Sequence, residues 1–305
     1  MTARSRGPWA LMFERLRVDR VAVLSALFLT AIILMAVAAP LIAQAVGHPR
    51  DITYSDIAVS PEGVPTGPSR AFLLGVDPGG RDVLVRLAYG ARMSLLAGIV
   101  SSILAMAIGV VVGIVSGYYG GLVDTILSRA MDIMLSLPLL LFAIALVALF
   151  DPRAYSYLGV IVFAAFSWAP VARVLRGQTL SLRESEYVQA ARSLGAGDAR
   201  IMFVEILPNL TATVIVYTTL CIPAAIVFEA SLSFLNLGAQ PPIPTWGNMI
   251  ADSAANFGYW WYLGAPSLAL LLTTVAFNLL GDSLRDATDP RHAAAVVSTE
   301  EAAKP

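Results

Sequence analysis

Long apolar runs separated by short polar segments set the pattern of this chain. Six such runs, rich in Leu, Ile, Val and Ala, occupy residues 21–46, 93–117, 130–150, 157–175, 209–234 and 263–282. About 20 apolar residues suffice to cross a hydrocarbon core of roughly 30 Å as a helix, so the pattern predicts six membrane-spanning helices. Prolines interrupt several of the runs, at Pro138, Pro170, Pro223 and Pro266. We expect them to start or kink helices, because neighbouring helices in a bundle can satisfy the backbone groups that proline frees.

The composition supports a membrane protein. Of the 305 residues, 57% are hydrophobic and 13% are charged, whereas a soluble domain carries about 25% charged residues. A soluble helical protein is therefore disfavoured, and the predicted fold class is an all-α polytopic membrane protein. The first run is longer than the apolar segment of a signal peptide, so we interpret it as a retained helix.

The distribution of Arg and Lys predicts the orientation. With the N-terminus in the cytosol, 14 of the 20 basic residues fall on the cytosolic side and six fall outside, which agrees with the positive-inside rule. Both termini are then cytosolic. The predicted segments are a cytosolic N-terminal segment at 1–20, a first transmembrane helix at 21–46, an external loop at 47–92, a five-helix core at 93–285 with a cytosolic hairpin at 176–208, and a cytosolic tail at 286–305.

Scarce residue types exclude several kinds of site. Lys304 is the only lysine, so the chain has no Gly-rich P-loop ending in Lys to hold nucleotide phosphates. Cys221 is the single cysteine, which excludes an internal disulfide. His48 and His292 lie outside the runs, which disfavours a histidine-based metal site or catalytic triad in the membrane. We predict no catalytic residue, no metal ligand and no cofactor bound by this chain, and the net charge of −1 suggests no nucleic-acid partner.

The segment 186–208 interrupts the apolar pattern with a polar hairpin. Residues 186–194 combine good helix formers without Pro or Gly, and Gly195 can adopt the left-handed conformation that ends a helix. Gly197 or Asp198 can then cap a second helix. An apolar stripe of that helix is expected to face the bundle, at Ile201, Val204 and Leu207. From these residues alone, a docking element and an ordinary interhelical loop are about equally favoured.

The sequence Ala-Ala-x3-Gly at residues 190–195, with Leu207-Pro208 downstream, resembles the EAA loop of ABC-importer permeases. In that family the loop forms a coupling helix that sits in a groove of the ATP-binding subunit. The resemblance implies an ATPase-coupling set at Glu186, Tyr187, Gln189, Ala190, Ala191, Arg192, Leu194 and Gly195. The chain departs from the motif at Gln189, where the family has Glu, and at Glu205, where it has Ile. Gln189 keeps the length and hydrogen-bonding capacity of Glu but loses the charge.

The resemblance extends over residues 70–291 and narrows the subfamily. Motifs similar to those of the peptide/nickel permease subfamily occur in order at residues 74–84, 89–95, 117–121, 129–138, 229–235, 244–247 and 281–291. The six-span length resembles the C-type member of a permease pair. The resemblance implies the type I ABC importer permease fold and the import of dipeptides, oligopeptides or similar small solutes. A nickel chelate or haem stays open as the solute.

The resemblance also implies partners and a location. The partners are a homologous permease in a heterodimer, two ATP-binding subunits that hold ATP and Mg, and an external solute-binding protein, with lipid around them in a bacterial plasma or inner membrane. Two other classes compete. A membrane-embedded enzyme is disfavoured by the placement of the histidines, and a stand-alone secondary carrier or channel would need no ATPase-docking hairpin.

Three polar residues within the runs are candidates for the solute path. Glu229, near the outer end of the fifth run, either marks a pathway or makes a polar contact between helices. Tyr217 and Asn278 are expected to line a central path. By contrast, Arg129 and Asp132 are expected to form a local ion pair.

The external side carries a second candidate group. Asp77, Arg81 and Asp82 either meet the external binding protein, shape an outer gate or form a plain structural turn. Trp246 belongs to the same group. Together with residues 260–262, it predicts an outer aromatic belt or a short re-entrant segment.

Overall fold

The computed structural model describes residues 8–150, 158–254 and 258–288, and the regular structure of these residues is helical. Within them, five helical segments are long and apolar enough to cross a membrane, and a sixth span is obtained if one bent helix pair is counted. The described residues therefore form the all-α, multi-span arrangement that the sequence predicts. The predicted tail beyond residue 288 lies outside the described residues.

The first predicted span is broken. Helix α1 (Pro8–Val18) leads into α2 (Arg20–Val37), and α3 (Ala39–Val46) follows after a break at Ala38. Proline lies in the first turn of α3, where its missing N–H and fixed φ are tolerated. The external segment that follows contains one short helix, α4 (Ser55–Ala58).

Helix α5 (Val83–Tyr119) begins ten residues before the predicted span, so the predicted loop at 47–92 is too long. Asp82 caps the helix, because its side chain accepts hydrogen bonds from the N–H groups of Leu84 and Val85. The 37 residues of α5 extend over about 55 Å, which exceeds the hydrocarbon thickness. The sequence did not predict the early start of α5 because Arg86 interrupts the apolar pattern, although this residue is buried.

Small residues let α5 and α9 (Ala169–Leu182) approach closely. A Cβ atom on Gly113 would lie 2.7 Å from the carbonyl oxygen of Ala172, and one on Gly117 would lie 2.7 Å from that of Arg176. Gly109 meets the carbonyl of Trp168 in the same way. This four-residue spacing of glycines is typical of tightly packed membrane helices.

Helices α6 (Gly121–Ser136) and α7 (Leu139–Val147) form the bent pair, with an angle of 82° between them. The pair covers most of the span predicted at 130–150 and begins earlier, at Gly121, and Pro138 lies at the bend, as expected. Helix α8 (Leu158–Ser167) continues into α9, which carries Pro170 in its first turn.

The polar hairpin contains α10 (Glu186–Ser193) and α11 (Asp198–Arg200). A π-helical segment, η1 (Ile201–Ile206), joins α11 to α12 (Leu207–Phe234) without a break. The last elements are α13 (Trp246–Ala254) and α14 (Trp260–Thr288). Pro223 and Pro266 lie inside α12 and α14.

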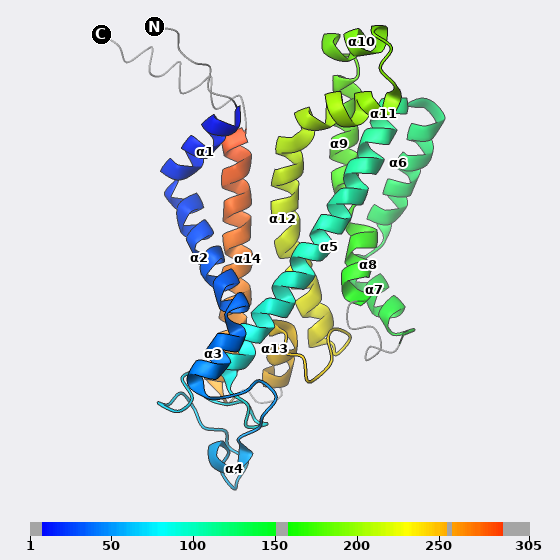
Figure 1. Cartoon of the computed structure of the whole chain (residues 1–305). Helices are drawn as coiled ribbons and strands as arrows, with labels where there is room; N and C mark the ends of the chain where they lie inside the picture. The colour runs from blue at the N-terminus through cyan, green and yellow to red at the C-terminus, as the bar shows by residue number, and fades with distance from the viewer. Residues whose placement is uncertain (1–7, 151–157, 255–257, 289–305) are drawn as a thin grey trace, which may run out of the picture.

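The two ends of the bundle differ (Figure 1). Helix α10, helix α1 and the end of α14 lie at one end, whereas α3, α4 and α13 lie at the other. Arg15 donates a hydrogen bond to the carbonyl of Ala287 at 3.2 Å, and Ser283 donates one to Asp19 at 2.6 Å. The described ends of the chain are therefore tied together on the side of the hairpin, which agrees with the predicted orientation.

Candidate functional site

Helix α10 projects from one end of the bundle and presents most of the predicted coupling residues to solvent (Figure 1). Leu194 has 88% of its surface exposed, although nothing in a monomer stabilises a leucine in that position. Val188 anchors the helix from its inner face, where it is fully buried, and Ala191 is half-buried. The other exposed members of the set are Glu186, Tyr187, Gln189, Ala190, Arg192 and Gly195.

Gly195 ends α10 in the left-handed conformation that the sequence predicts, with φ at +81°. Its N–H donates to the carbonyl of Arg192 at 3.0 Å, and the N–H of Ala196 donates to that of Ala191 at 3.0 Å. This pair of bonds is the Schellman motif. A Cβ atom added to Gly195 would meet no atom within 4 Å, so only the backbone conformation requires glycine here.

Gln189 uses its side chain locally. Its Nε2 donates a hydrogen bond to the carbonyl of Glu184 at 3.0 Å, which ties α10 to the turn before it. A glutamate, as in the family motif, has no donor for this bond when ionised. Compared with the Glu of the family motif, Gln189 therefore lacks the acidic group but makes a hydrogen bond within the hairpin.

Three residues that sequence reasoning missed hold the hairpin on the bundle. Tyr118, at the end of α5, donates a hydrogen bond from its hydroxyl to Asp198 at 2.8 Å. The guanidinium of Arg192 lies 5.7 Å from the centre of the Tyr118 ring. Asn209 donates to the hydroxyl of Tyr187 at 3.2 Å, and Arg183 donates to the carbonyl of Gly117 at 3.2 Å. A Tyr-Tyr-Gly-Gly sequence directly after an apolar run was the available signal for Tyr118.

The predicted apolar stripe is partly wrong. Ile201 is buried, but Val204 is 56% exposed, and Ile206 and Leu210 take the inward positions. The reason is the π-helical segment, because its wider turn shifts the inward residues from a spacing of three to one of four and five. Gly197 occupies the N-cap position of the second helix, as expected.

Ion pairs fasten α6 to α9 near the same end. Arg176 and Asp124 form a bidentate pair, in which Nη2 lies 2.6 Å from Oδ2. Arg129 and Asp132 form the expected local ion pair at 3.5 Å, and Arg173 also contacts Asp132.

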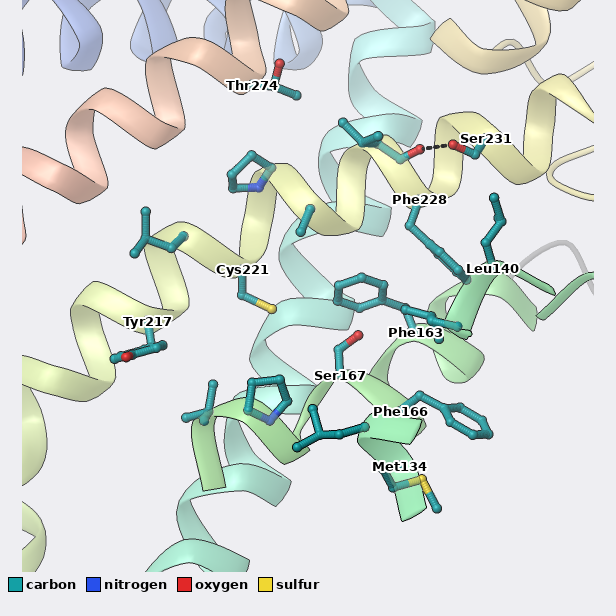
Figure 2. A pocket seen from close by; sticks show the side chains of 18 of the residues that line it. Met134, Leu140, Phe163, Phe166, Ser167, Tyr217, Cys221, Phe228, Ser231 and Thr274 are labelled. Atoms are coloured by element: carbon teal, nitrogen blue, oxygen red, sulfur yellow. Dashed lines mark hydrogen bonds between the residues drawn. The ribbon is translucent and has the colours of Figure 1, made fainter. Parts of the chain in front are cut away.

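A cavity of about 880 Å³ lies between α6–α7, α8–α9, α12 and α14. Figure 2 shows Tyr217, Cys221 and Phe228 of α12 facing a common space with Phe163 and Phe166 of α8. Two of the three predicted path residues, Tyr217 and Asn278, line this cavity.

Glu229, the third predicted path residue, lies elsewhere. It accepts hydrogen bonds from Ser94 of α5 at 3.0 Å and from Ser233 of α12 at 2.6 Å. The hydroxyl of Ser94 also accepts from the N–H of Trp246 at 3.3 Å. Glu229 borders a separate space of about 30 Å³ and is not among the residues that line the large cavity. Glu229 therefore makes a polar contact between helices, which was the alternative to a role in the path. Through Ser94, this contact joins α5, α12 and α13.

Asp77 and Asp82, the two acidic residues of the predicted outer group, are buried. Asp77 accepts from the N–H groups of Gly79 and Arg81, each at 2.9 Å, and from the Arg81 guanidinium at 2.8 Å. Arg86 lies 3.4 Å from the same carboxylate. Asp82 caps α5 and lies 2.6 Å from Nδ1 of His48. Of the predicted outer set, only Arg81 keeps an exposed part.

Trp246 is completely buried and donates from its indole to the carbonyl of Leu87 at 3.2 Å. Its side chain consequently offers no surface to an external protein in this conformation. Trp246 begins the short helix α13, which lies between the last two long helices. Trp261 packs against Gly75 and donates to the carbonyl of Val76 at 3.2 Å.

Comparison with known families decides what this architecture is. Residues 109–293 match the family described as the binding-protein-dependent transport system inner membrane component. The chain belongs to this family. Residues 7–59 match the N-terminal transmembrane domain of oligopeptide transport permease C. The protein is thus a multi-pass inner-membrane permease subunit of an ABC importer, and such permeases work with ATP-binding and solute-binding partners.

Individual relatives cover the permease almost from end to end. The dipeptide transport system permease protein DppC of Alkalihalophilus pseudofirmus is 38% identical, over 93% of this chain and 90% of its own. The glutathione transport system permease protein GsiD of Pectobacterium atrosepticum is 40% identical, over 94% of this chain and 92% of its own. The di/tripeptide transport system permease protein DppC of Pseudomonas aeruginosa is 40% identical, over 87% of this chain and 86% of its own.

Proposed function

We propose that this permease imports dipeptides, short oligopeptides or close analogues such as glutathione. The observation that carries the proposal is the near full-length similarity to permeases named for dipeptides, glutathione and di/tripeptides. These names favour peptides over a nickel chelate or haem. The cavity of about 880 Å³ is also large enough for a small organic solute, since pockets for such ligands measure roughly 300–1,000 Å³.

The exposed face of α10 is the proposed contact with an ATP-binding subunit. The side chains of Tyr187, Arg192 and Leu194 project from a helix whose inner face is fixed by Val188. The small Ala190 allows close approach to the backbone between them. ATP and Mg would bind to the partner, because this chain has no lysine within a Gly-rich loop.

Movement of the hairpin would reach the membrane by two routes. The first is direct, because α11, η1 and α12 form one continuous helical segment that leads to the cavity. The second runs from Asp198 to Tyr118 at the end of α5. Closure of two ATP-binding subunits would displace both helices and switch access to the path from the cytosolic to the external side. ATP can drive this switch only if the ATPases fit the two states with different affinity.

The remaining partners complete the importer. A homologous permease would pair with this chain as a heterodimer and form the other half of the path, and an external binding protein would deliver the solute. The external segment suits such a contact because buried hydrogen bonds fix its turn. Its buried carboxylates, Asp77 and Asp82, hold the turn around Arg81 in place.

Uptake by the complete complex tests the proposal. We expect that a strain lacking its other peptide importers takes up labelled dipeptide when it makes this permease with its partners. Uptake should stop when the partner ATPase cannot hydrolyse ATP. Uptake of a nickel chelate or haem, with no uptake of any di- or tripeptide, would contradict the peptide assignment.

A further inference from the structure

The walls of the large cavity carry no ionised group. Among the described residues, 20 line it, and none of them is Asp, Glu, Lys, Arg or His. Four aromatic rings and many aliphatic side chains account for most of the surface. The nearby carboxylate of Glu229 does not line the cavity and is held by Ser94 and Ser233 instead.

The polar groups of the cavity divide into two kinds. Ser231 and Thr274 are satisfied within their own helices, by the carbonyls of Val227 at 2.7 Å and Leu270 at 2.9 Å. Within the described part of the chain, the side chains of Ser167, Tyr217 and Asn278 make no hydrogen bond. They lie on α8, α12 and α14, so neutral hydrogen-bonding groups surround the space from three sides.

These free groups indicate what fills the cavity. An amide or hydroxyl without a partner is unfavourable against lipid tails, whereas water and a peptide backbone can both bond to it. A volume of about 880 Å³ holds roughly 30 water molecules at about 30 Å³ each. The cavity can therefore take a short peptide together with water around its charged ends.

Building on the proposed importer function, we propose that this wall of the path does not discriminate between peptides by charge. It supplies apolar and aromatic contacts and neutral hydrogen bonds, and the charged groups of the peptide stay hydrated. A fixed charge here would attract one class of peptide and repel the other. Net charge would then be selected by the binding protein or the partner permease, not by this chain.

Charges placed on the wall test the proposal. Val227 lines the cavity on α12 and is uncharged. Val227→Asp therefore adds one negative charge to the wall, and Val227→Lys adds one positive charge. Val227→Asn is the neutral control of the same size as Asp. Ser167→Asp, compared with Ser167→Asn, repeats the test from α8. The complete complex in proteoliposomes, saturated with loaded binding protein, is assayed with acidic, neutral and basic dipeptides. The binding protein is the same throughout, so changes between variants report on the permease.

The ratio of acidic to basic uptake by the wild-type complex is the reference, because the binding protein and the partner permease are the same in every variant. The Asp variants should lower the ratio of acidic to basic uptake by roughly a hundredfold or more. A charge roughly 10 Å away at an effective dielectric constant of about 20 changes the uptake of acidic and of basic peptides by about tenfold or more each, in opposite directions. Val227→Lys should raise that ratio, and the Asn variants should leave it unchanged.

Three results would overturn the inference. Unchanged charge ratios in Asp and Lys variants that still import peptides would show that the path avoids this wall, and the importer function would stand. Loss of the partner permease from the purified complex in all these variants would show that the partner fills the cavity. Absence of ATP-driven peptide uptake by the wild-type complex would remove the proposed function and the inference together.

Discussion

At the scale of single residues, the site depends on backbone conformation as much as on side-chain chemistry. Gly195 is required by its φ of +81° and not by crowding. Gln189 bonds to a neighbouring carbonyl, and Glu229 satisfies two hydroxyls. The sequence predicted the first of these roles from glycine chemistry. It left the role of Glu229 open, because Ser94 is 135 residues away in the chain.

Replacing Gly195 with Val should abolish uptake while the permease still inserts into the membrane. A β-branched residue is strongly disfavoured at positive φ, so the end of α10 and the face that it presents would shift. Uptake of labelled dipeptide and membrane content of the permease are the measurements. Gly195→Asn is the matched control, because Asn tolerates the left-handed region, and it should retain most of the activity. Normal ATP-driven uptake by Gly195→Val would sink the coupling role of α10.

Glu229→Leu should destabilise the permease by about 1–3 kcal/mol for each hydroxyl left unsatisfied. The hydroxyls concerned belong to Ser94 and Ser233, which are both buried. Thermal unfolding of the purified complex in detergent measures the loss. Glu229→Gln keeps an acceptor oxygen and should lose less. Equal stability of the wild-type and Leu proteins would show that this network contributes little.

At the scale of elements, the apolar pattern located the five long apolar helices and the bent pair α6–α7. The ends and bends of these helices followed from contacts that the pattern does not contain. Helix α5 starts at Val83 because Asp82 caps it and because Arg86 is buried beside Asp77. Pro138 predicted a bend between α6 and α7, but a proline in the sequence does not give the size of the bend, which is 82°. The inward stripe of η1 was misjudged, since a π-helical turn leaves no clear mark in a sequence.

The contact of α5 with α9 gives a test at this scale. Gly113→Ala should destabilise the permease, because the added Cβ would lie 2.7 Å from the carbonyl oxygen of Ala172. Gly264→Ala in α14 is the control. No atom lies within 4 Å of its added Cβ, and alanine is favoured over glycine in a helix by roughly 0.5–1 kcal/mol. Thermal unfolding of the two variants should change in opposite directions. A gain in stability from Gly113→Ala would contradict the close packing.

At the scale of the whole molecule, the described part of the permease joins the hairpin of α10 and α11, a cavity without ionised side chains and the segment before α5. Residues far apart in the sequence make these connections: Tyr118 with Asp198, and Ser94 with both Glu229 and Trp246. Sequence reasoning found the hairpin and two residues of the cavity. It left open whether Asp77 and Asp82 meet a binding protein, shape an outer gate or form a structural turn, because burial cannot be read from residue type alone.

Cross-linking of α10 to the ATP-binding subunit tests the central claim most directly. Leu194→Cys, in a protein whose single native cysteine is changed by Cys221→Ala, can carry a thiol-attached photocross-linker. Ile57→Cys, at the opposite end and 76% exposed, is the control. We predict that the cross-linker at Leu194→Cys captures the ATP-binding subunit in a complex that imports peptides, and that the one at Ile57→Cys does not. Failure to capture that subunit from Leu194→Cys, in a complex that still imports peptides, would contradict the account.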